Sequence, residues 1–168
     1  MITDFLSEEN IALHKEYVRQ RRLKYSILEG SVPALCGASV GCVMRLRLDR
    51  RDRADALSLL PEIVLHDIFF SSFSDVGYPR SPLLASEYGS EAAYLNGLYR
   101  LCINSTHGFL VIEKGGGASV VCDYPSAFRY ADPVLALDLC EHAYFLDYGF
   151  DRERYLVSAL SYFDLTKI

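Results

Sequence analysis

ALDLCEHAYFLDY, residues 136–148, places two acids and a histidine among apolar and aromatic residues. The three polar residues are Asp138, Glu141 and His142. Burying such groups in apolar surroundings is costly unless they are paired, hydrogen-bonded or bound to a metal. We therefore expect this stretch to contribute to a polar site whose other members come from elsewhere in the chain.

The composition describes a globular chain with no obvious anionic or membrane partner. Of its 168 residues 51% are hydrophobic, which suffices for one well-cored domain or two small lobes sharing a core. The net charge of −5 argues against a nucleic-acid binder. Acids interrupt the one basic run, residues 44–53, so we interpret that run as a solvated face.

The sequence shows neither a secretory leader nor an apolar run long enough to span a membrane. We therefore expect a cytoplasmic protein without a membrane partner. The five cysteines form no CxxC pair, which is typical of reduced thiols and not of a disulfide framework or a thiolate zinc site.

Two long helical patterns occupy the first part of the chain. Apolar spacing predicts a helix over residues 6–28, with a start signal at Ser7 and an end at Gly30. A second pattern covers residues 52–73. Pro61 is expected to kink or divide this second helix, because proline removes a backbone donor.

Residues 77–82 contain two prolines and a glycine and form the best candidate for a linker. We place a boundary there, between an N-terminal helical hairpin lobe at residues 1–76 and a C-terminal α+β lobe at residues 77–168.

The C-terminal lobe combines helices with three short β-rich runs. A third helix is predicted at residues 84–104, strands at 108–114, 118–123 and 133–139, and a closing helix at 151–163. Three glycines between the first two strands predict an antiparallel hairpin. The predicted fold class is α plus α+β: a helical hairpin followed by an α+β lobe with a small three-stranded antiparallel sheet.

Two of the four histidines, His14 and His66, lie on the apolar sides of the first two predicted helices. Taken singly, each is more often a hydrogen-bonded core histidine than a ligand. Together with Asp138 and His142 they would supply three imidazoles and one carboxylate. That donor set suits iron or manganese, and also zinc.

The order and context of these residues resemble the iron/manganese superoxide dismutase family over nearly the whole chain. DLCEHAY, residues 138–144, resembles the family's Asp-x-Trp-Glu-His-Ala-Tyr signature. LHDIFFSSF resembles the Asn-His-x-x-Phe-Trp segment and puts His66 on its ligand, and LSEENIALHKEYV puts His14 on the first ligand. The resemblance implies the family's two-lobe fold, with the metal between the lobes.

The same resemblance implies a ligand set, an activity and an assembly. One iron or manganese ion per subunit would be held by His14, His66, Asp138 and His142. The protein would be an antioxidant enzyme that disproportionates superoxide to dioxygen and hydrogen peroxide. It would form a homodimer, in which Glu141 reaches the partner subunit's His142 and Tyr144 lies near the same face.

The chain departs from the family pattern around the metal. Cys140 stands in place of the signature's Trp, and Phe145 in place of a usual Tyr. Arg22 stands where the first helix usually carries a Tyr, and we interpret it as a residue that steers an anion towards the site. A helix-surface arginine without a role is the alternative.

Glu62 stands where iron-type enzymes carry a Gln, four residues before the second histidine ligand. On a helix Glu62 and His66 share a face, so we interpret Glu62 as a carboxylate beside the open position of the metal. The alternative is an exposed glutamate next to Pro61. Because the usual Gln is absent, the sequence does not distinguish iron from manganese.

These departures predict weakened or altered dismutase activity. Two other classes stay open. One is a metal-binding or structural protein on this fold without dismutase activity, and the other is a different metalloenzyme that reacts with peroxide or dioxygen.

Overall fold

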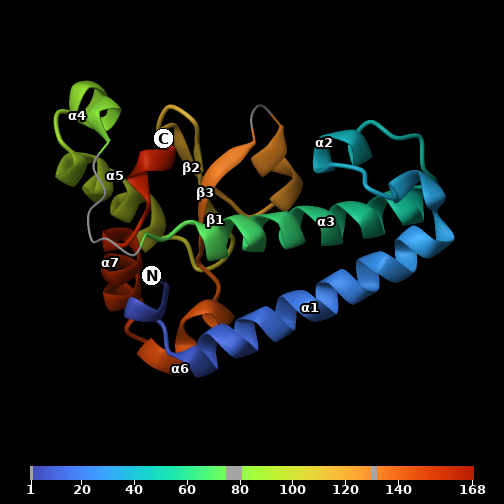
Figure 1. Cartoon of the computed structure of the whole chain (residues 1–168), viewed down its shortest axis with the longest axis horizontal. Coiled ribbons are helices and arrows are strands. Elements are labelled where there is room, and N and C mark those ends of the chain that lie inside the picture. Colours follow the sequence, from blue (N-terminus) through green and yellow to red (C-terminus); the bar gives the residue numbers. More distant parts are fainter. Residues whose placement is uncertain (1, 75–80, 130–131) are drawn as a thin grey trace.

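The computed structural model describes residues 2–74, 81–129 and 132–168 (Figure 1). Its N-terminal part is a hairpin of two long helices, α1 (Glu8–Ser31) and α3 (Arg50–Ser71), joined at the far end by η2 (Pro33–Leu35) and α2 (Val40–Val43). The remaining helices, strands and turns are η1 (Ile2–Asp4), α4 (Pro82–Tyr88), α5 (Glu91–Ile103), β1 (Phe109–Glu113), β2 (Ala118–Val121), η3 (Tyr124–Phe128), β3 (Pro133–Asp138), η4 (Glu141–Ala143), α6 (Phe145–Tyr148), α7 (Arg152–Ser161) and η5 (Leu165–Lys167).

The first helix begins as the sequence predicts. The Ser7 hydroxyl accepts a hydrogen bond from the Asn10 amide at 3.1 Å and so caps the helix. The buried face of α1 carries Ile11, His14 and Val18. His14 therefore points between the two helices of the hairpin.

The second long helix is continuous through Pro61, so of the two predicted effects, a kink or a division, the division is wrong. Proline removes one backbone donor, but the turns on either side remain anchored by buried side chains. Leu59, Ile63 and Leu65 are all at most 9% exposed. Their packing holds the helix together across the missing hydrogen bond.

The predicted third helix over residues 84–104 is wrong as a single element, since α4 and α5 are separate helices. Gly89 has a φ of +78°, a conformation that ends α4 and that glycine adopts without strain. Ser90 is extended, and its hydroxyl caps α5 by accepting from the Ala93 amide. The break therefore comes from local turn chemistry that the apolar spacing does not reveal.

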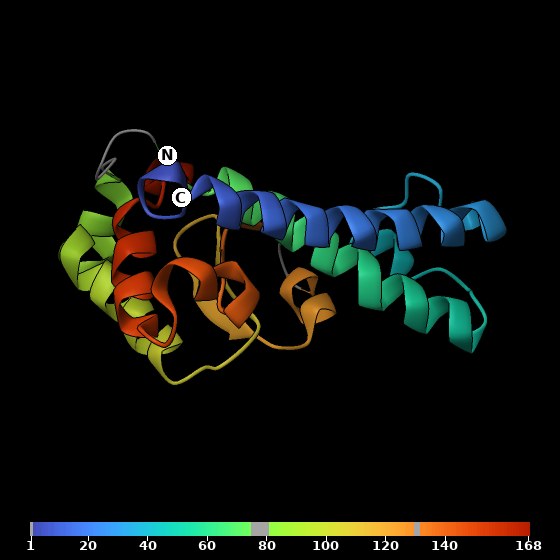
Figure 2. The same ribbon diagram turned by 90° about the horizontal axis from the view of Figure 1, so that it is seen from below.

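The sheet is three-stranded and antiparallel throughout, with the order β2-β1-β3, which confirms the predicted fold class. The central strand β1 is buried, and the first residue of β1, Phe109, pairs with the last residue of β3, Asp138. That register places Asp138 at the end of the sheet nearest the hairpin. Figures 1 and 2 show α5 and α7 on the side of the sheet away from the tip of the hairpin.

The hairpin is fixed to the α+β lobe at its base. At the end of α3 the Ser72 hydroxyl accepts from the Ala136 amide of β3 at 2.8 Å. At the start of α1 the Asp147 carboxylate accepts from the Ser7 amide and from the Asn10 side chain, each at 2.9 Å. The base of the hairpin is therefore anchored to β3 through α3 and to α6 through α1.

The predicted boundary between residues 76 and 77, and residues 77–80 of the predicted linker, lie outside the described residues. Within the described part of the chain, no helix is both long and apolar enough to cross a bilayer.

Candidate metal centre

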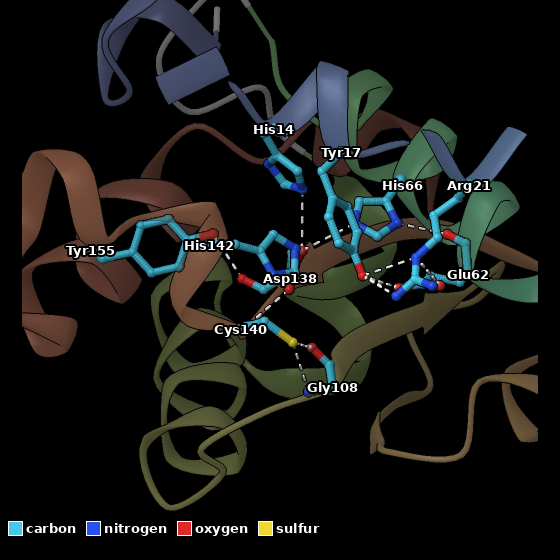
Figure 3. Close-up of polar contacts among 10 residues, drawn as sticks. All are labelled: His14, Tyr17, Arg21, Glu62, His66, Gly108, Asp138, Cys140, His142 and Tyr155. Carbon is cyan, nitrogen blue, oxygen red and sulfur yellow. Dashed lines mark hydrogen bonds and ion pairs between the residues drawn. The ribbon is translucent and has the colours of Figure 1, made fainter. Parts of the chain in front are cut away.

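Four side chains from four different elements converge between the hairpin and the sheet (Figure 3). We call them the ligand cluster: His14 of α1, His66 of α3, Asp138 of β3 and His142 of η4. One nitrogen or oxygen atom of each lies within 4.8 Å of those of the others. The Nε2 atoms of the three histidines lie 3.2, 3.3 and 2.9 Å, respectively, from the same Oδ2 atom of Asp138.

The cluster is buried and its polar atoms are poorly satisfied. His14, His66 and Asp138 are at most 1% exposed, and the His142 side chain is 34% exposed. Within the described part of the chain, Oδ2 of Asp138, Nε2 of His66 and both ring nitrogens of His14 have no hydrogen-bond partner. A buried unsatisfied polar atom costs about 1–3 kcal/mol. A cation bound by these lone pairs would satisfy them, so the residues fit a metal ion.

Charge in the cluster favours metal binding. Burial raises the pKa of Asp138, but the three imidazoles that face its carboxylate outweigh this effect and hold that pKa well below its usual range. Burial lowers the pKa of His14 more than Asp138 raises it. Burial also lowers the pKa of His142, but the nearby Asp138 carboxylate outweighs burial and raises that pKa above 6.5. A carboxylate and a neutral His14 are thus ready as ligands at neutral pH.

Backbone groups orient two of the ligands. Nδ1 of His66 lies 2.7 Å from the carbonyl of Glu62, and donating a proton there leaves Nε2 free for a metal. The Cys140 amide donates to Oδ1 of Asp138 at 2.8 Å, which leaves Oδ2 facing the imidazoles. The Tyr155 hydroxyl donates to the Asp138 carbonyl, also at 2.8 Å.

Cys140 supports the site without being a ligand. Its sulfur accepts a hydrogen bond from the Gly108 amide at 3.4 Å. Burial, and then the charge of Asp138, raises the pKa of Cys140 to about 12. The group therefore remains a thiol, and a thiolate would be required for metal binding.

Glu62 is 4% exposed, which excludes the alternative of a surface glutamate. Its Oε1 accepts from the Tyr17 hydroxyl at 2.6 Å, and its Oε2 lies 3.1 Å from Nε of Arg21. Nη2 of Arg21 also donates to the Tyr17 hydroxyl at 2.7 Å. We call these three residues the Glu62 network. Glu62 is not one of the four residues whose ligand atoms converge.

The Glu62 network touches the ligand cluster through Tyr17. The Tyr17 ring stacks on the His142 ring with centroids 4.6 Å apart, and its centroid lies 5.7 Å from that of His66. In Figure 3 its hydroxyl points away from the imidazoles towards Glu62 and Arg21. Tyr17 therefore connects the two groups of residues.

The sequence reasoning missed Tyr17 and Arg21. Their spacing from His14, three and seven residues, puts all three on one face of α1 and could have indicated them. Arg22 instead pairs with Asp67 on the exposed side of the hairpin, where both side chains are about half exposed.

The other candidate residues lie around His142. Glu141 is exposed next to it on η4. Tyr144 is buried and stacks on Tyr155 with ring centroids 4.6 Å apart. Tyr144 is therefore linked to the ligand cluster through Tyr155, which hydrogen-bonds to Asp138.

A sequence model described as iron/manganese superoxide dismutases, C-terminal domain, matches residues 84–168. This range is half of the chain and contains Asp138 and His142. His14 and His66 lie outside it, and the fold brings them to the same place. No curated protein matches the chain.

Proposed function

Because the chain belongs to the iron/manganese superoxide dismutase family, we propose that it binds one iron or manganese ion per subunit in the ligand cluster and disproportionates superoxide. Two superoxide ions and two protons give one dioxygen and one hydrogen peroxide. The observation that carries this proposal is the convergence of three imidazole nitrogens on one buried, unsatisfied carboxylate oxygen.

The metal, when bound, supplies one-electron chemistry by alternating between trivalent and divalent states. Three imidazoles and one carboxylate suit iron and manganese, and they also suit zinc. Family membership favours the two redox-active metals. The protein's own part is to hold the ligands: His66 through the Glu62 carbonyl and Asp138 through the Cys140 amide.

The Glu62 network controls the charge next to the cluster. Burial, and then the hydrogen bond to Glu62, raises the pKa of Tyr17 to about 12, so its hydroxyl remains a donor. Arg21 is 32% exposed and places a positive charge beside a half-buried tyrosine. We assign the attraction of anionic substrate to Arg21, with Arg22 beyond it on the same helix. Replacement of the usual Gln by Glu62 supports altered activity.

The exposed apolar residues beside His142 support a homodimer. Phe145, Leu146 and Phe150 are 46%, 51% and 93% exposed. A second subunit covering them would also cover the exposed part of His142. In that arrangement Glu141 would hydrogen-bond to the partner subunit's His142 and fix its orientation.

Metal content and superoxide turnover of purified protein test the proposal together. We expect about one iron or manganese ion per chain, as the four-ligand cluster implies, and turnover that depends on this metal. Protein that retains neither metal after loading under reducing conditions would contradict the proposal.

A metal-binding or structural protein without dismutase activity is the second candidate. The observation that favours it is Glu62, a carboxylate in place of the family's Gln. Stoichiometric metal without superoxide turnover would establish this candidate in place of the first.

A further inference from the structure

Glu62 is a buried carboxylate, and a buried charge is costly unless it is paired, hydrogen-bonded or bound to a metal. Its side chain is 5% exposed. Removing one member of a buried ion pair is strongly destabilising, because the remaining charge is then unpaired. The position of any cation near Glu62 therefore decides where its carboxylate lies.

Two cations compete for Glu62 once the cluster is loaded. One is the Arg21 guanidinium, whose Nε lies 3.1 Å from Oε2. The other is the metal itself, since iron and manganese accept carboxylate oxygen readily. In the structure the pair is formed with Arg21, and the Tyr17 hydroxyl holds the second carboxylate oxygen at 2.6 Å.

Glu62 lies close enough to the cluster for this competition to matter. Its backbone carbonyl is 2.7 Å from Nδ1 of His66, a member of the cluster one helical turn away. Its carboxylate is one hydrogen bond from Tyr17, whose ring stacks on His142. Glu62 and His66 lie one turn apart on α3, so a change of the Glu62 rotamer is the movement that binding of its carboxylate to the metal would require.

We propose that Arg21 is a positioning residue that holds Glu62 outside the metal's ligand set, so that a small anion can bind the metal. This inference rests on the metal-binding part of the proposed function. Without Arg21, the buried Glu62 carboxylate turns to the remaining cation and becomes a fifth protein ligand. The metal is then held more firmly while its open position is blocked.

The test is azide binding to the iron(III)-loaded protein, with metal retention against a chelator measured in parallel. In Arg21→Met, azide affinity falls by about tenfold or more, and the rate of iron loss to the chelator is lower than in the wild type. Opposite movements of the two quantities separate the proposal from simple damage to the site. Damage would weaken both.

Two further variants test whether Glu62 causes the loss of azide affinity. Arg19→Met removes an arginine from the same helix, one that pairs with Glu16 on the surface, and leaves azide affinity within about twofold of wild type. Arg21→Met combined with Glu62→Gln restores azide affinity to within about twofold, because an amide is a far weaker ligand. If Arg21→Met does not fold, Arg21→Gln replaces it, both alone and combined with Glu62→Gln, with Arg19→Met again as the control. Its azide affinity falls in the same direction but by a smaller factor.

Unchanged azide affinity in Arg21→Met, or no recovery in the double variant, overturns the proposal. A wild-type protein that binds iron and azide but does not turn over superoxide would contradict the proposed dismutase activity. The inference about Arg21 would be unaffected. Wild type that binds no metal overturns both.

Discussion

Nε2 of His142 lies 2.9 Å from Oδ2 of Asp138, although the two residues come from a turn and a strand. The Cys140 amide between them in sequence holds the other carboxylate oxygen. One short segment thus supplies two ligands and orients one of them. The two remaining members of the ligand cluster, His14 and His66, come from the two helices of the hairpin.

Asp138→Asn tests whether this oxygen is the centre of the site. The substitution keeps the shape of the side chain but removes its charge, so three imidazoles lose their common partner. Metal affinity should fall by more than about 100-fold, since residues that merely orient a ligand already contribute about 10–100-fold. Chelator competition measures this. Asp67→Asn, on the exposed side of α3, is the control and should bind metal as wild type does.

Metal binding should also depend on pH through His142. A histidine must lose its proton to bind a metal, and the charge of Asp138, opposing burial, raises the pKa of His142 above 6.5. Affinity is therefore greatest above that raised pKa and falls as the pH decreases through it. Chelator competition at about pH 8 and about pH 6 checks the direction. Equal affinities, corrected for the chelator's own protonation, would contradict the assignment.

Helices and turns that depend on local sequence signals could be predicted from the sequence alone. Ser7 starts α1 where its capping pattern predicts, and the glycines after β1 mark the hairpin of the sheet. The ligand cluster could be named in advance because Asp138 and His142 lie in one recognisable stretch. His14 and His66 followed from similar segments in the expected order.

The Glu62 network could not be predicted in the same way. Glu62 meets Tyr17 and Arg21 only because α1 and α3 pack at one particular rotation, which apolar spacing does not define. The resemblance directed attention to Arg22, the residue aligned with the family's tyrosine. Arg22 faces Asp67 instead, and the neighbouring turn of α1 supplies both a tyrosine and an arginine.

Gly108→Ala should destabilise the fold near the site. Gly108 has a φ of +95°, and an added Cβ would lie 2.3 Å from the Val121 carbonyl oxygen. We expect a loss of about 3 kcal/mol in the free energy of unfolding. Denaturant titration measures it. Gly97→Ala, a helical position with open space around it, should instead gain about 0.5–1 kcal/mol.

Phe150→Asp tests the proposed dimer face. Phe150 is 93% exposed in the single chain, and its ring contacts Phe145 edge-on at 5.3 Å. If a second subunit covers this face, a buried unpaired charge there should shift the protein to a monomer without unfolding it. Sedimentation velocity, with circular dichroism as a check on folding, measures both. Leu83→Asp, at a 39% exposed position on α4, is the control that should leave the assembly unchanged. A Phe150→Asp protein that sediments like the wild type would place the subunit contact elsewhere.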